Sequence, residues 1–120
     1  MNTRVYDLQE RLVAYSVAII HMAEALPKTV TGSHIRNQML RSGTSPAPNY
    51  GEAQGAESRS DFAHKLKIVL KELRETQVWL QVIRQAQLCS ADEMLLRLLE
   101  ETNELIAIFV TSIKTSAAKQ

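Results

Sequence analysis

Four long stretches of the chain carry apolar residues at alternating spacings of three and four. This spacing places the apolar residues on one side of an α-helix. The four glycines and three prolines, which would interrupt such helices, all lie within residues 27–55. Strand-like alternation and Asn-Gly or Asp-Gly hairpin turns are absent from the sequence. The pattern therefore predicts an all-α protein.

The first two predicted helices lie on either side of Pro27. The first covers residues 4–26, and its apolar side is formed by Val5, Leu8, Leu12, Tyr15, Ile19, Met22 and Leu26. Pro27 ends it, because a proline ring clashes with the preceding helical turn. Ser33 is the expected N-cap of a second helix over residues 34–55. Pro46 and Pro48 each remove a backbone donor, so we expect this helix to be interrupted at residues 43–48.

The last two predicted helices each follow a capping sequence. Ser58-x-x-Asp61 precedes a helix over residues 59–87, whose apolar side is formed by Phe62, Leu66, Val69, Leu73, Thr76, Leu80 and Ile83. Ser90-x-x-Glu93 precedes a helix over 91–115, with Leu95, Leu98, Thr102, Leu105, Phe109 and Ile113 on one side. Residues 115–120 are expected to form a frayed tail.

Short connections make consecutive helices adjacent and opposed. The predicted architecture is therefore an antiparallel up-down-up-down four-helix bundle. A chain of 120 residues is the size of one domain, so we expect residues 1–120 to form a single domain.

Charge and cysteine content narrow the class of protein. Fourteen basic and thirteen acidic residues leave a net charge of +1, so no overall positive field attracts nucleic acid or acidic membranes. Cys89 is the only cysteine, which excludes an intrachain disulfide. The sequence shows neither a signal segment nor an apolar run of about 20 residues that could span a membrane. We expect a cytoplasmic protein that does not contact membranes.

No group of residues has the spacing of a catalytic, cofactor or metal site. Di-iron bundles use Glu-x-x-His pairs, whereas this chain has His21-x-x-Glu24 and Asp61-x-x-His64. The glycines do not form a phosphate-binding loop, and Cys89 has no base nearby in sequence. We expect a non-enzymatic protein without cofactor or metal. The enzyme alternative would use a site built from Glu52, Glu72 and Glu75.

Basic residues on the third helix raise the possibility of phosphate contacts. Lys67, Lys71 and Arg74 follow one another at i, i+4 and i+7, and so form a stripe. Glu72 and Glu75 lie close to them, so the alternative is a solvated face of mixed charge. Arg36 and Arg41 are further candidate nucleic-acid contacts.

Glu72 lies two helical turns from both Lys65 and Trp79, beside the apolar stripe. We expect Glu72 and Trp79 to face a helix–helix contact or a subunit interface. A boundary glutamate with its carboxylate in water is the alternative.

A second set of apolar residues remains after each helix has supplied one stripe to the core. The set consists of Val13, Val17, Ile20, Ile68, Trp79, Leu96, Leu99, Ile106 and Val110. A small four-helix bundle needs about one stripe per helix, so the second set indicates burial between subunits. Wide single stripes that absorb these residues within one chain are the alternative.

The central part of the sequence resembles the four helix bundle protein family, also called the 23S rRNA intervening-sequence protein family. The resemblance rests on Arg41-Ser42-Gly43-Thr44-Ser45, Asn49-Tyr50-x-Glu52-Ala53-Gln54, Glu57-Ser58-x-x-Asp61-Phe62, Lys65-Leu66, Leu70-Lys71-Glu72-x-Arg74-Glu75-Thr76 and Trp79-Leu80. Pro46-Ala47-Pro48 departs from the family pattern, which leaves the local backbone there open.

The resemblance implies a small antiparallel bundle that assembles into a ring, often a pentamer, without an established reaction. Related bundles in diversity-generating retroelements bind nucleic acid. We therefore expect a homo-oligomeric scaffold or adaptor, with RNA or a ribonucleoprotein as candidate partner; direct RNA binding is the alternative. The candidate subunit-interface residues, where the family-like residues concentrate, are Asn49, Tyr50, Glu52, Gln54, Glu72, Glu75 and Trp79.

Overall fold

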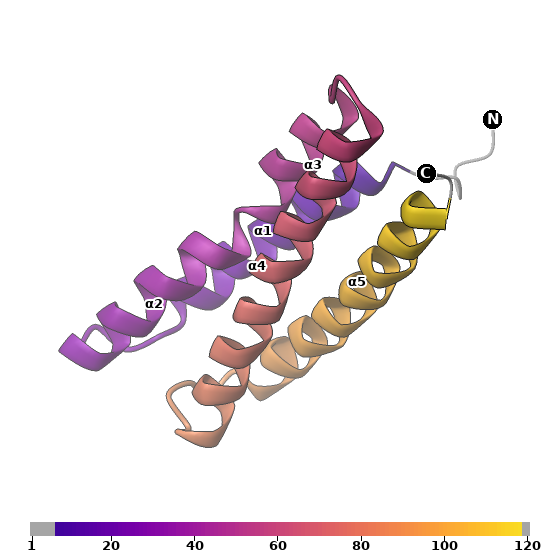
Figure 1. Cartoon of the computed structure of the whole chain (residues 1–120). Coiled ribbons are helices and arrows are strands. Elements are labelled where there is room, and N and C mark those ends of the chain that lie inside the picture. The colour runs from indigo at the N-terminus through magenta and orange to yellow at the C-terminus, as the bar shows by residue number, and fades with distance from the viewer. Residues whose placement is uncertain (1–6, 119–120) are drawn as a thin grey trace.

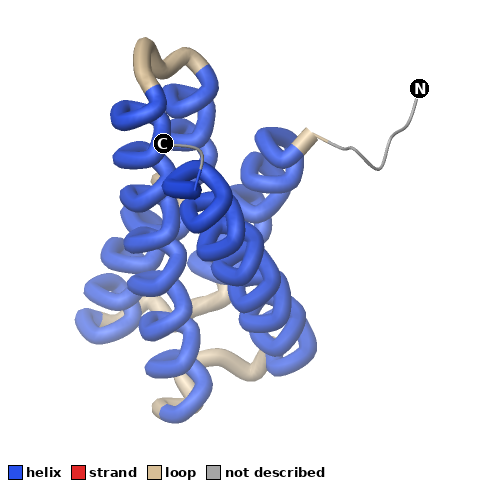
Figure 2. Tube along the Cα trace, turned by 45° about the vertical axis from the view of Figure 1, so that its right-hand side comes forward, coloured by secondary structure: helices blue, strands red, loops and turns tan. Residues whose placement is uncertain are grey.

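The computed structural model describes residues 7–118, and these form an all-helical bundle. The helices are α1 (Leu8–Glu24), α2 (Val30–Gly43), α3 (Pro46–Gln54), α4 (Arg59–Gln85) and α5 (Asp92–Ala118). Figure 2 shows helices and connecting loops, and no strand, over the described residues. The all-α prediction is confirmed.

The helices pack around one hydrophobic core. α4 and α5 lie side by side and are joined by a short loop, while α2 and α3 follow one another along α4 (Figure 1). α1 and α4 each pack against α2, α3 and α5, so they lie on opposite sides of the bundle. The core includes five fully buried residues: Leu12, Ile19, Met39, Leu73 and Phe109.

The first connection is shorter than the sequence suggests. α1 ends at Glu24, where the N–H groups of the next two residues turn back to the carbonyls of Met22 and Ala23. The predicted N-cap Ser33 is wrong: Thr29 caps α2, and its Oγ1 accepts a hydrogen bond of 3.0 Å from the N–H of Gly32. Thr29 has the extended backbone that a cap requires, so α2 starts at Val30, three residues after Pro27. Residues 4–6 of the predicted first helix lie outside the described residues.

The break around the prolines is also shorter than predicted. Helical structure stops only at residues 44–45, rather than over 43–48, and α3 begins at Pro46. Pro46 and Pro48 both lie in its first turn, where backbone N–H groups have no acceptor within the helix. The two prolines lack backbone N–H groups, but these groups would have no acceptor within α3, so no hydrogen bond of the helix is lost.

The two capping sequences behave differently. Ser58 caps α4 as predicted, because its Oγ accepts from the N–H of Asp61 at 3.0 Å. The Ser90 cap is wrong, since α5 begins at Asp92 and the N–H of Leu95 donates to the carbonyl of Ala91, which occupies the cap position. The predicted frayed tail is wrong for residues 115–118, which continue α5; the two alanines there favour helix.

One buried hydrogen bond links α1 to α5 within the core. The hydroxyl oxygens of Tyr15 and Thr102 lie 2.6 Å apart, and both residues are at most 2% exposed. Thr102 Oγ1 also donates to the carbonyl of Leu98 at 2.7 Å. Because Thr102 has one hydroxyl hydrogen, Tyr15 is the donor between the two side chains. Burial raises the pKa of the Tyr15 hydroxyl far above its ordinary value.

Candidate interaction site on α2 and α4

A charged cluster joins the last turn of α2 to the middle of α4. Arg41 forms ion pairs with Glu72, at 3.4 Å between Nη1 and Oε1, and with Glu75. The two glutamates lie one turn apart on α4, so one guanidinium reaches both. The Glu72 side chain is only 12% exposed, whereas the Arg41 side chain is 54% exposed. The cluster thus lies at the rim of the α2–α4 contact.

Trp79 extends this cluster along α4. Its indole Nε1 donates to Glu75 Oε2 at 3.1 Å, and its ring lies at 88° to that of His34 on α2, with 6.3 Å between centroids. Such an edge-to-face arrangement is favourable for aromatic rings. The sequence predicts that Glu72 and Trp79 face a helix–helix contact or a subunit interface, and both contact α2 within one chain.

The two residues that follow Arg41 also make contacts that the sequence did not reveal. The hydroxyl oxygens of Ser42 and Thr76 lie 2.8 Å apart, and both residues are 0% exposed. A Cβ added to Gly43 would lie 2.8 Å from Ile19 Cγ1, closer than such carbon atoms approach. Arg41 and Ser42 thus contact α4, and Gly43 contacts α1. The only signal for these contacts in the sequence is the small size of Ser42 and Gly43.

The Arg41–Glu75 pair makes stability depend on pH. Hydrogen bonds from Arg41 and then from Trp79 hold the pKa of Glu75 below its ordinary value of 4.5. A carboxylate with a lowered folded-state pKa stabilises the fold above its unfolded-state pKa, and this contribution is lost as pH falls through the folded-state value. Glu75→Gln should therefore reduce the free energy of unfolding at pH 7, and the difference from wild type should shrink below pH 4.5.

Urea titrations over a pH series measure this difference. Glu57→Gln is the matched control, because Glu57 lies exposed in the α3–α4 loop. A Glu75→Gln deficit that stays constant between neutral and acidic pH would contradict the role of the ion pair.

The remaining candidate interface residues lie on α3. Asn49 Nδ2 donates to the carbonyl and Oγ of Ser45, and Glu52 forms an ion pair of 2.8 Å with Lys65 on α4. Tyr50 packs edge-on against Phe109 of α5, with ring centroids 5.7 Å apart. Gln54 is exposed at the end of α3. The contacts of Tyr50 and Glu52 join helices of one chain, whereas those of Asn49 stay within α3 and its cap. A role of these residues in subunit contact stays a prediction.

The candidate nucleic-acid contacts fall into two groups. Arg36 donates to the carbonyls of Ala23, Leu26 and Pro27, and so binds the C-terminal end of α1. Arg41 is held by its two glutamates. By contrast, three exposed residues remain together on α4: Lys67, Lys71 and Arg74.

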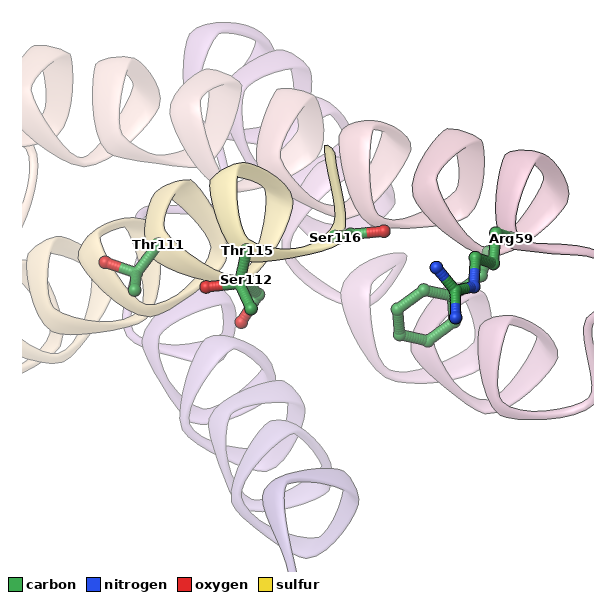
Figure 3. Close-up of a pocket in the computed structure, with 6 residues that line it drawn as sticks. Arg59, Thr111, Ser112, Thr115 and Ser116 are labelled. Carbon is green, nitrogen blue, oxygen red and sulfur yellow. The ribbon is translucent and has the colours of Figure 1, made fainter. Parts of the chain in front are cut away.

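A hollow of about 460 Å³ lies between the start of α4 and the end of α5. Figure 3 shows the hydroxyl-bearing side chains that α5 contributes to its lining and Arg59 on α4. The lining residues are Arg59, Phe62, Thr111, Ser112, Thr115 and Ser116. The hollow has the size of a small-molecule site. Four of the six residues carry hydroxyl groups, but none is a carboxylate, histidine or thiol that could act as the general acid or base a hydroxyl nucleophile requires.

Residues 7–118 contain neither a cluster of metal-binding side chains nor a helix that could cross a membrane. No cluster of three or more His, Cys, Asp or Glu side chains there could hold a metal ion. No helix in that range is both long and apolar enough to cross a membrane.

Comparisons with known proteins agree with this architecture. No curated protein matches the sequence. A crystal structure of a protein of unknown function from the S23 ribosomal protein family of Bacteroides thetaiotaomicron matches with a TM-score of 0.80 and 29% identity. The match covers 90% of this chain and 99% of the other. The model of the 23S rRNA-intervening sequence protein family matches residues 4–111. The chain therefore belongs to the 23S rRNA-intervening sequence protein family.

Proposed function

We propose that this protein is a non-enzymatic scaffold or adaptor that assembles into a closed ring of identical subunits. Each subunit would be an antiparallel up-down-up-down bundle. The family resemblance implies five subunits, since helix periodicity does not specify their number. RNA or a ribonucleoprotein is the proposed partner of the assembled ring.

The observation that carries this proposal is the aliphatic surface left exposed by the bundle. Four members of the second apolar set are exposed: Val13 by 49%, Val17 by 45%, Ile20 by 43% and Leu96 by 43%. Two further valines on α4, Val78 and Val82, are 53% and 37% exposed. Burial of this surface between subunits would be favourable. Other members of the set, among them Ile68, Leu99, Ile106 and Val110, are half-buried within the chain.

Multi-angle light scattering at micromolar concentration tests the assembly. The expected mass is five times the 13.5 kDa of one chain. The mass of a single chain would overturn the proposed function, whereas a stable dimer or tetramer would overturn the number five alone.

Direct RNA binding is the second candidate, supported by the exposure of Lys67, Lys71 and Arg74 along α4. Phosphate contacts release counterions, so affinity for a structured RNA would fall steeply with salt. A gel-shift titration over a salt series should show this fall for the wild type. The variant Lys67→Ala/Lys71→Ala/Arg74→Ala should show a smaller salt slope. An affinity that is independent of salt would exclude this candidate.

A further inference from the structure

Two helices expose faces that combine aliphatic and charged residues. The first, termed the α1 face, consists of Glu10, Val13, Val17, Ile20 and Glu24. The second, termed the α4 face, consists of Lys67, Lys71, Arg74, Val78 and Val82. All ten residues are exposed.

The α1 face points directly away from the core. Its members occur at successive spacings of three and four, which makes them one stripe along the helix. The buried side of the same helix is formed by Leu12, Tyr15, Ile19 and Met22. The α1 face therefore has a glutamate at each end and three exposed aliphatic residues between them. Its only charges are negative.

The α4 face carries positive charge, opposite in sign to that of the α1 face. Its members also follow one another at spacings of three and four, opposite the buried side of α4. The first three are basic and the last two are aliphatic. The exposure of Val78, at 53%, exceeds that of the other large apolar residues on α4 and α5.

The two faces match in length, chemistry and charge. At 1.5 Å per residue, Glu10 to Glu24 spans about 21 Å and Lys67 to Val82 about 22 Å. Because a glutamate stands at each end of the α1 face, the basic end of the α4 face meets a carboxylate in either helix direction. In either direction Val78 then lies opposite an aliphatic residue of the α1 face, and the aliphatic stems of Lys71 and Arg74 lie over the other two, which favours association beyond charge steering.

We infer that the α1 face of one copy packs against the α4 face of the next. This inference rests on the proposed self-assembly and names the two surfaces that carry it. α1 and α4 lie on opposite sides of the bundle, so each copy offers the two faces in different directions. Such a contact joins two different patches and leads to a ring when its rotation closes. Lys67, Lys71 and Arg74 accordingly face a protein neighbour rather than phosphate.

Two variants test the pairing of the faces. In each blocked variant, a charge placed in one face prevents that face from packing against a neighbour. Val17→Lys places a positive charge in the α1 face, where it repels the basic residues of the α4 face. Val78→Asp places a negative charge in the α4 face, where it repels the glutamates of the α1 face. Both positions are about half exposed, so each variant should keep the wild-type helix content and melting temperature. Each variant alone should be a monomer by light scattering. An equimolar mixture should form a 1:1 pair of twice the 13.5 kDa chain mass and nothing larger, because one intact face remains on each copy.

Val30→Asp is the matched control, since Val30 is 90% exposed and belongs to neither face. It should assemble like the wild type. The inference is overturned if the two blocked variants stay monomeric after mixing, if either one still assembles alone, or if Val30→Asp is equally disruptive. A wild type that is itself monomeric overturns the proposed function instead.

The charge contribution is tested within the same pair. Lys71→Glu added to the Val17→Lys copy alters the α4 face in use, and should raise the dissociation constant of the pair at least about tenfold. The same change in the Val78→Asp copy alters a face that is already blocked, and should leave the constant unchanged. Equal effects in the two copies would contradict the assignment of Lys71 to the contact. An unchanged pair, with RNA binding lost in Lys71→Glu, would assign this residue to phosphate.

Discussion

Replacing Gly43 with alanine is expected to lower the free energy of unfolding by about 1–3 kcal/mol, as for overpacked cores in general. The new Cβ would lie 2.8–2.9 Å from three carbon atoms of Ile19, whose side chain is fully buried. α1 and α2 would have to separate, or Ile19 would have to leave its packed position. Helix propensity acts in the opposite direction, since alanine is favoured over glycine by about 1 kcal/mol. Because the contact involves a packed core side chain, we expect the clash to dominate.

The same substitution at Gly55 is the control. The nearest atom to a Cβ there is the carbonyl oxygen of Glu52 at 3.8 Å, which is ordinary contact. Gly55→Ala should therefore be neutral or slightly stabilising, because it reduces the conformational entropy of the unfolded chain.

Urea denaturation in an Ile19→Ala background identifies the cause. Removing the Ile19 side chain leaves room for the alanine at position 43, so the second substitution should be much less damaging there than in the wild type. An equal loss in both backgrounds would show that the close approach of α1 and α2 is not responsible.

Removal of the Thr102 hydroxyl should be the second large effect. Thr102→Val preserves shape but leaves the buried Tyr15 hydroxyl without its 2.6 Å partner. An unsatisfied buried donor of this kind lowers the free energy of unfolding by about 1–3 kcal/mol. Tyr15→Phe should be milder, because the Thr102 hydroxyl still donates to the carbonyl of Leu98.

The double variant Tyr15→Phe/Thr102→Val removes both hydroxyls and leaves no unpaired donor between these two side chains. We expect it to be more stable than Thr102→Val alone, as measured by urea denaturation. A double variant that is less stable than either single variant would contradict the hydrogen-bond account and point to packing instead.

Helix positions could be derived from the sequence because the forces that set them act within a few residues. The stripe through Leu12, Tyr15 and Ile19 marks the buried side of α1, and the structure buries these residues. Ser58 caps α4 as predicted because its partner, Asp61, is three residues away. The misplaced caps at Ser33 and Ser90 show the limit of such reasoning: several nearby residues can begin a helix, and small differences in backbone geometry select one of them.

What the sequence by itself determined is thus the all-helical class, the buried side of each helix and the aliphatic residues left over. Only the tertiary structure decided which helices become neighbours. The contacts of Arg41 with Glu72 and Glu75, of Ser42 with Thr76, and of Gly43 with Ile19 join different helices. Periodicity gives the direction of a side chain around its own axis but not the rotation and offset of the helix that faces it. Those two quantities follow from the packing of the whole core.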